Sequence, residues 1–383
     1  MNGFMFRNLR QIRAHMAGLA LLTATFLPTE GLALEPEQIG VKTLPNPTET
    51  WLMARDGLGT LYIFDSATGD MHGLLGISQF TPAVQPNLQA NEFYAAESYY
   101  SRNTRGERTD VLTIYDMPTL NPKAEIKIPN KIAALPFRRY IALLDDQRFL
   151  AIFNLTPAQS VSVVDLQNQS FVTELSTPGC ALTIPTVDRA FLQLCGDGKI
   201  QLIRLGTDGN EQARVRSRAF FDIPKDPVFD KTARTAEGWL LLSYEGQVFD
   251  VSVEDEKIDI SDAWQLLDDD QRAENWRPGG GQFFTYHEGL DLLFVLMNNV
   301  GGYSHDHAGN EVWVYDRSAK RLVSRLPLPQ KGTNVFVSRN DDALLTVTGT
   351  DRQLHVYDVK TMKLVRTIGE VGVSPGYLQG VTH

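Results

Sequence analysis

Residues 354–368 read LHVYDVKTMKLVRTI. Leu354 and Val356 alternate with His355 and Tyr357, as in a strand whose two faces differ. Asp358 ends that strand, and its carboxylate can accept hydrogen bonds from backbone N–H groups two residues on. A second apolar strand, residues 364–368, follows the turn. The stretch therefore predicts a β-hairpin.

Looser copies of this hairpin recur along the whole chain, each marked by an aspartate near the end of a strand. The seven markers are Asp65, Asp116, Asp165, Asp208, Asp250, Asp316 and Asp358. They lie roughly 40 to 65 residues apart, and a period of this size with about four strands per unit is typical of β-propeller blades. The sequence thus predicts an all-β fold, a seven-bladed β-propeller.

The two ends of the predicted propeller complement each other. The first unit has only three clear strands, residues 50–54, 60–65 and 71–76, whereas residues 376–382 have strand character and follow a complete seventh unit. We expect this C-terminal strand to join the first blade and close the ring, because closure removes exposed sheet edges. One propeller domain over residues 34–383 is predicted.

The N-terminus has the features of a secretory signal peptide. Arg7, Arg10 and Arg13 precede an apolar run over residues 16–27, and small residues end at Ala33. This order predicts a cleaved signal over residues 1–33. The alternative, a buried or membrane-spanning N-terminal helix, is disfavoured because the run is shorter than the ~20 apolar residues that cross a bilayer.

The charge balance bears on possible partners. The net charge is −10, and no run of basic residues exceeds Arg138-Arg139. Nucleic acid is therefore an unexpected partner. No later segment is apolar enough over a sufficient length to span a membrane, so no membrane association of the mature chain is expected.

Cys180 and Cys195, the two cysteines of the chain, lie on or beside strands of the fourth unit. Neighbouring antiparallel strands joined by a turn at residues 186–188 would bring them together, and an oxidising compartment favours the bond. A disulfide is predicted, with two buried free thiols as the alternative.

Three segments interrupt the strand pattern. Residues 99–110 and 298–309 are expected to be loops, and loops on a rigid scaffold often bind partners. Residues 260–274 form the one good helical candidate, with Ser261 as its cap and Trp264, Leu266 and Leu267 on its apolar face.

A search for catalytic motifs finds none of the common hydrolase, phosphate-binding or zinc patterns. His305-Asp306-His307 comes nearest to a metal cluster, since alternate strand positions would share a face, but a third ligand is missing and a hydrated loop is favoured. Gly279-Gly280-Gly281 has no helix after it that could bind phosphate. The sequons at Asn154 and Asn168 are short patterns that are common by chance.

Five parts of the chain carry a family resemblance: residues 101–110, residues 156–165, the Cys180 and Cys195 pair with residues 195–198, residues 264–267, and residues 275–280. In these parts the chain resembles the heavy subunits of quinoprotein amine dehydrogenases. The resemblance covers essentially the whole mature chain and is closer to the aralkylamine branch than to the methylamine branch.

The resemblance implies a role in a periplasmic α2β2 enzyme that oxidises primary amines to an aldehyde and ammonia. In that family the small (light) subunit carries the tryptophan tryptophylquinone cofactor, and electrons pass to a blue-copper protein such as azurin or amicyanin. This chain would then hold neither cofactor, metal nor catalytic residue. Phe80, within residues 76–82, matches the heavy-subunit phenylalanine that reaches the substrate channel, although it is also compatible with an ordinary core aromatic.

Two other functions remain possible from the residues alone. A free-standing periplasmic binding propeller would have similar strand and turn repeats. A propeller hydrolase with a metal in its central channel would need several carboxylates, amides or imidazoles on the innermost strands, and these strands supply few.

Overall fold

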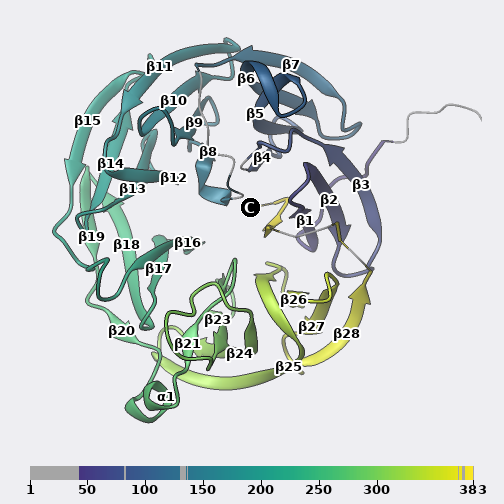
Figure 1. Cartoon of the computed structure of the whole chain (residues 1–383), viewed down its shortest axis with the longest axis vertical. Helices are drawn as coiled ribbons and strands as arrows, with labels where there is room; N and C mark the ends of the chain where they lie inside the picture. Colours follow the sequence, from purple (N-terminus) through teal and green to yellow (C-terminus); the bar gives the residue numbers. More distant parts are fainter. Residues whose placement is uncertain are drawn as a thin grey trace, which may run out of the picture. The chain divides into compact units, whose positions relative to one another are not determined.

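The computed structural model describes residues 43–81, 83–129, 135, 137–369, 371–372 and 376–382. The predicted signal peptide, residues 1–33, lies outside the described residues. The chain from Lys42 onward forms one compact unit, and its sheets are arranged around a common centre (Figure 1). No helix in the described ranges is long and apolar enough to cross a bilayer.

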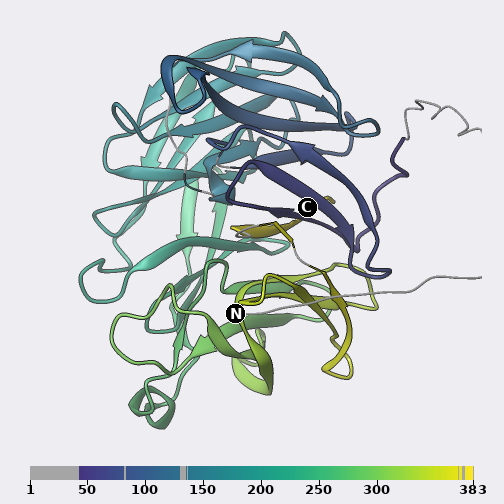
Figure 2. The same cartoon turned by 45° about the vertical axis from the view of Figure 1, so that its right-hand side comes forward.

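The first sheet joins the two ends of this unit. Strand β29 (Tyr377–Gly380) pairs antiparallel with β1 (Trp51–Arg55), so that Tyr377 lies opposite Arg55. Two further strands complete the sheet, β2 (Thr60–Asp65) and β3 (Met71–Gly76). Figure 2 shows the yellow C-terminal strand beside the purple strands of this sheet.

Four more sheets follow in chain order, each an antiparallel meander. The second contains β4 (Val84–Asn87), β5 (Glu92–Arg102), β6 (Arg105–Asp116) and β7 (Pro122–Lys127). The third contains β8 (Ile141–Leu143), β9 (Phe149–Asn154), β10 (Ser160–Asp165) and β11 (Ser170–Ser176), with the short 3-10 helix η1 (Arg138–Tyr140) before it. The fourth contains β12 (Cys180–Thr186), β13 (Ala190–Cys195), β14 (Ile200–Leu205) and β15 (Glu211–Arg216). The fifth contains β16 (Val228–Arg234), β17 (Gly238–Ser243), β18 (Gln247–Glu254), β19 (Lys257–Ile260) and β20 (Trp264–Gln265).

The last sheet has eight strands and corrects the predicted blade count. Its strand β25 (Arg321–Val337) runs without a break, pairing with β24 (Gly309–Asp316) through its first part and with β26 (Leu344–Gly349) through its last. The other members are β21 (Arg277–Pro278), β22 (Phe284–His287), β23 (Leu292–Asn298), β27 (Leu354–Asp358) and β28 (Lys363–Ile368). The described residues therefore form five sheets of blade size and one double-sized sheet. The all-β propeller fold is confirmed. The prediction of seven separate blades is wrong, because β25 joins into one sheet two groups of strands that the repeat pattern assigns to separate blades.

The marker aspartates shape the turns, as predicted, although the geometry varies. The Asp65 carboxylate accepts from the Ala67 N–H at 2.8 Å, two residues on. Asp358 instead accepts from the Thr361 N–H at 2.7 Å, three residues on. Asp250 departs from the pattern, since it accepts from the Arg317 side chain of the next sheet.

Most of the predicted helix over residues 260–274 is not helical. Trp264 belongs to β20 and pairs with Val248. Leu266 and Leu267, which follow β20 in the chain, are buried in the core. Only α1 (Asp269–Ala273) is helical, with Asp268 rather than Ser261 as its N-cap. The helical prediction fails because burying the apolar side chains from an extended segment outweighs local helix preference.

The insertion at residues 99–110 is also ordered differently from the prediction. It is not a loop but the outer part of a long hairpin, in which Tyr100 pairs with Arg108 and the chain turns after Arg102. The second insertion is irregular, as expected, since residues 299–308 form no strand.

Candidate functional site

Phe80 lies on the connection between β3 and β4. Its side chain is half-buried and packs edge-to-face against Tyr100, with ring centroids 5.3 Å apart and planes at 70°. Tyr100 also lines a shallow surface hollow with Arg108, Thr156 and Pro157. The two rings, which we call the Phe80–Tyr100 patch, thus present an apolar surface next to a cationic side chain.

The loop that carries Phe80 is fixed to the neighbouring sheet through Ser78. The Ser78 N–H donates to Glu97 Oε1 at 2.8 Å, and its hydroxyl donates to the Ser98 carbonyl at 2.5 Å. The Phe80 N–H in turn donates to Ser78 Oγ at 3.2 Å. A half-exposed aromatic on such an anchored backbone is preorganised to contact a partner.

Glu97 is the centre of this anchor and is fully buried. The Tyr115 hydroxyl donates to Glu97 Oε2 at 3.1 Å. Burial, and next the charge of Glu97, raise the pKa of Tyr115 and of Tyr99 well above the usual phenol value. The Tyr115 phenol therefore stays protonated and donates to the Glu97 carboxylate. No sequence pattern singles out Glu97, because a single acid in a strand resembles a solvent-facing residue.

The His305 loop is held by aromatic rings. His305 stacks on Phe229 at 5.0 Å and 12°, and Tyr303 packs against it at 4.5 Å. Residues 305–307 form a turn rather than a strand, so the two imidazoles do not share a strand face. No group of three or more metal-ligating side chains occurs within the described ranges. The loop is thus an aromatic cluster, a feature that the sequence analysis missed.

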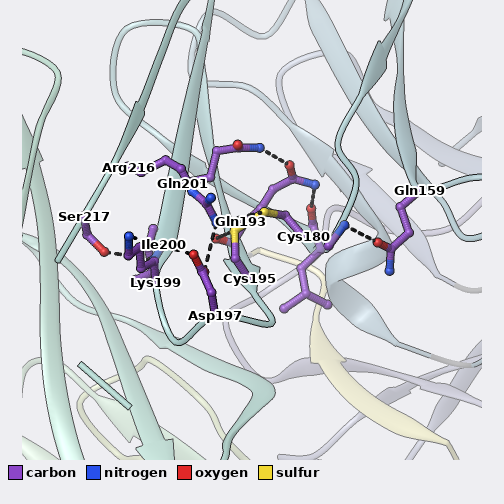
Figure 3. The surroundings of a disulfide bond; sticks show 12 residues. Gln159, Cys180, Gln193, Cys195, Asp197, Lys199, Ile200, Gln201, Arg216 and Ser217 are labelled. Carbon is purple, nitrogen blue, oxygen red and sulfur yellow. Dashed lines mark hydrogen bonds and ion pairs between the residues drawn. A yellow bond between two sulfur atoms is a disulfide. The ribbon is translucent and has the colours of Figure 1, made fainter. Parts of the chain in front are cut away.

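Cys180 and Cys195 form the predicted disulfide (Figure 3). The two residues lie directly opposite each other on β12 and β13. The same sheet carries buried amide contacts, since Gln201 Nε2 donates to Gln193 Oε1 at 3.1 Å and Gln193 Nε2 to the Leu182 carbonyl at 2.9 Å. The disulfide is structural, because its position is within one sheet and away from the Phe80–Tyr100 patch.

Replacing both cysteines by serine is expected to lower the free energy of unfolding by about 3 kcal/mol. The bond closes a loop with a sequence separation of 15 residues, and in the chain-entropy description a loop of that size is worth about that much. Urea denaturation of the wild-type chain and the double variant would measure it. A loss below about 1 kcal/mol would contradict the expectation.

Comparisons with known proteins agree on one family. The family model described as methylamine dehydrogenase heavy chain (MADH) matches residues 53–381. The methylamine dehydrogenase heavy chain of Methylobacillus flagellatus is 25% identical over 321 residues, covering 82% of this chain and 80% of that protein. Those of Methylorubrum extorquens and Paracoccus versutus are each 26% identical, covering 74% and 82% of this chain and 70% and 74% of their own lengths.

Solved structures support the fold alone. The dihydro-heme d1 dehydrogenase NirN is 13% identical with a TM-score of 0.56, over 90% of this chain and 78% of that one. The Cps50 (Swd1) β-propeller domain of Myceliophteria thermophila is 11% identical with a TM-score of 0.54, over 81% and 93%. At these identities they bear on architecture only.

The family match extends over almost the entire described propeller, from β1 to the residue after β29. The curated relatives are named for methylamine, so they do not support the closer resemblance to the aralkylamine branch. The chain belongs to the methylamine dehydrogenase heavy chain family.

Proposed function

We propose that this chain is the non-catalytic heavy subunit of a periplasmic amine dehydrogenase. The observation that carries the proposal is the family match over residues 53–381. The overall reaction converts a primary amine and water to an aldehyde and ammonia, releasing two electrons and two protons. Tryptophan tryptophylquinone, bound on a separate light subunit, supplies the oxidising chemistry.

The residues of this chain would shape access to that subunit. The Phe80–Tyr100 patch is apolar, partly exposed and held by the Ser78–Glu97 anchor. Such a surface can exclude water and select amines by the shape of their side chains. Phe80 is therefore proposed as a substrate-channel residue, and no catalytic residue is proposed in this chain.

The proposed assembly contains a light subunit, a second copy of the heterodimer and, as electron acceptor, a blue-copper protein of the azurin or amicyanin type. A periplasmic location is supported by the signal-like sequence over residues 1–33 and by the disulfide, since such bonds persist in oxidising compartments. A free-standing periplasmic binding propeller is the alternative.

We also propose that the two halves of the eight-stranded sheet act as the sixth and seventh blades. The first half contains β22, β23, β24 and the start of β25, and the second contains the end of β25 with β26, β27 and β28. Each half then has the four strands of a propeller blade.

The substrate is proposed to be a primary amine, and the aralkylamine preference stays a prediction. Kinetics with methylamine and a phenylalkylamine on the assembled enzyme would test it. A kcat/KM that is higher for the phenylalkylamine would support the aralkylamine branch, and a higher value for methylamine would contradict it.

The purified chain alone is expected to reduce no redox dye when a primary amine is added. The reason is that the cofactor is proposed to lie on the light subunit. Co-expression with that subunit and its maturation system should restore amine-dependent dye reduction. Reduction of the dye by the single chain would overturn the proposed division of roles.

A further inference from the structure

The centre of the propeller contains a cavity of about 550 Å³ that the proposed function does not use. Its lining comes in part from β4, β8 and β16, which face the middle of the ring in Figure 1. Residues of β22 and β29 also line it. Phe80 and Tyr100 are not part of that lining. The volume is in the range of sites that bind small molecules.

The lining of this cavity is strongly cationic, although the whole chain carries a net charge of −10. Its charged side chains are five cations and one carboxylate: Arg138, Arg139, Lys231, Arg234, Arg339 and Asp230. Lys231 is paired with Asp230. The four arginines have no carboxylate oxygen within 4.0 Å in the part of the chain that the structure describes. The positive charge of the cavity is thus not neutralised from within.

The arginines are placed at different depths. Arg139 is only 7% exposed; its Nε donates to Thr232 Oγ1 at 2.9 Å and its guanidinium lies 4.2 Å from the centre of the Trp239 ring. Arg234 contacts the same ring at 5.1 Å and is exposed. These contacts orient Arg139 and Arg234 without supplying a negative charge.

Arg138 and Arg339 complete the set. Arg138 is half-buried, and its Nε has no hydrogen-bond partner among the described residues. Burial lowers the pKa of Arg138 to about 10, with a second contribution from the charge of Arg339. Burial likewise lowers the pKa of Arg139, followed by repulsion from Arg138 and Arg234. The four guanidinium groups therefore repel one another across the cavity.

Acidic side chains outside the cavity offset this repulsion only in part. Glu288 acts on both Arg234 and Arg339, Asp145 on Arg234, and Glu49 on Arg339. Partial desolvation of the two rim guanidinium groups nevertheless lowers the pKa of both arginines. None of these three carboxylates lines the cavity. A bound anion would offset the remaining repulsion among the four guanidinium groups.

We propose that the central cavity binds a small molecule with two or more carboxylate or phosphate groups. The planar guanidinium group of arginine can donate two parallel hydrogen bonds to a carboxylate or a phosphate. Such charge-assisted hydrogen bonds are stronger than hydrogen bonds between neutral groups. Neutral donors from Asn87, Thr232 and Gln282 also line the site and could complete the coordination of the oxyanion. Anion binding in this cavity does not depend on the proposed amine dehydrogenase role.

Isothermal titration calorimetry of the purified full chain with sodium pyrophosphate, and separately with trisodium citrate, tests the site. We expect saturable binding of at least one probe in about 0.1 M sodium chloride, where nonspecific surface attraction is screened. Binding of pyrophosphate alone would indicate a phosphate ligand, and binding of citrate alone a polycarboxylate. Absence of saturable heat for both probes at millimolar concentration would overturn the proposal.

Variants locate the binding. Arg339→Gln and Arg234→Gln at the exposed rim should each weaken binding about tenfold or more, since each removes a charge-assisted hydrogen bond. Arg321→Gln is the matched control, because Arg321 is an exposed arginine on β25 outside the cavity and its loss changes the net charge equally. Circular dichroism would verify that all three variants are folded. Equal weakening in the control, or unchanged binding in both rim variants, would contradict a cavity site.

Discussion

Phe80→Ala is expected to change the ratio of kcat/KM between a bulky and a small primary amine by about 10- to 200-fold in the assembled enzyme. The side chain is half-buried on a connection and contacts Tyr100 at its edge, so its removal alters the shape of a surface more than the density of a core. Pocket shape distinguishes substrates by about 1–3 kcal/mol for a methylene-sized change. Steady-state kinetics with methylamine and a phenylalkylamine would measure the ratio.

A stability measurement separates this role from packing. If Phe80 were a core residue, Phe80→Ala would cost about 3–5 kcal/mol through the cavity left behind. Phe171→Ala is the control for the stability cost of removing a packed ring. Phe171 is a partly buried phenylalanine that packs against a different part of the propeller core. A large fall in melting temperature for Phe80→Ala, with an unchanged ratio of kcat/KM, would remove Phe80 from the substrate channel.

Glu97→Ala is expected to lower the free energy of unfolding by about 2–5 kcal/mol, because it leaves the buried Ser78 N–H and Tyr115 hydroxyl without their acceptor. Glu97→Gln keeps one acceptor oxygen and the side-chain volume, so it should cost less. Urea denaturation of the two variants would measure the difference. In the assembled enzyme Glu97→Ala should also shift amine selectivity in the direction of Phe80→Ala, since both disturb the same loop.

Equal losses for Glu97→Ala and Glu97→Gln would contradict the role of the carboxylate as an acceptor. Tyr115→Phe provides a control for the second hydrogen bond, because it removes the hydroxyl and keeps the ring. Loss of stability without any change in selectivity would restrict Glu97 to a purely structural role.

The repeat pattern predicted the propeller because it reports local structure. The hairpin around Asp358, the strand before Asp65 and the pairing of the C-terminal strand with the first sheet all follow from alternation and turn chemistry. The continuity of β25 is different, since it depends on pairing with β24 and β26 at once. Trp264 was misassigned to a helix for a related reason, because its partner Val248 is set by the tertiary fold.

Candidate functional residues could be predicted only where a resemblance supplied them. Phe80 was identified from its match to a family pattern, and the structure adds the Ser78–Glu97 anchor that the sequence does not indicate. The central arginines form no sequence motif apart from Arg138-Arg139, since Arg234 and Arg339 come from distant sheets. Only the closed ring brings these charges to one cavity.

Purification of the native complex from the periplasm distinguishes an amine dehydrogenase subunit from a free-standing propeller. We expect this chain to copurify with a small, cysteine-rich subunit in equal amounts, and we expect the complex to have a quinone absorption band that a primary amine bleaches. A secreted chain that is isolated without any such subunit, and without a quinone band, would contradict the proposed subunit role and favour a free-standing binding propeller.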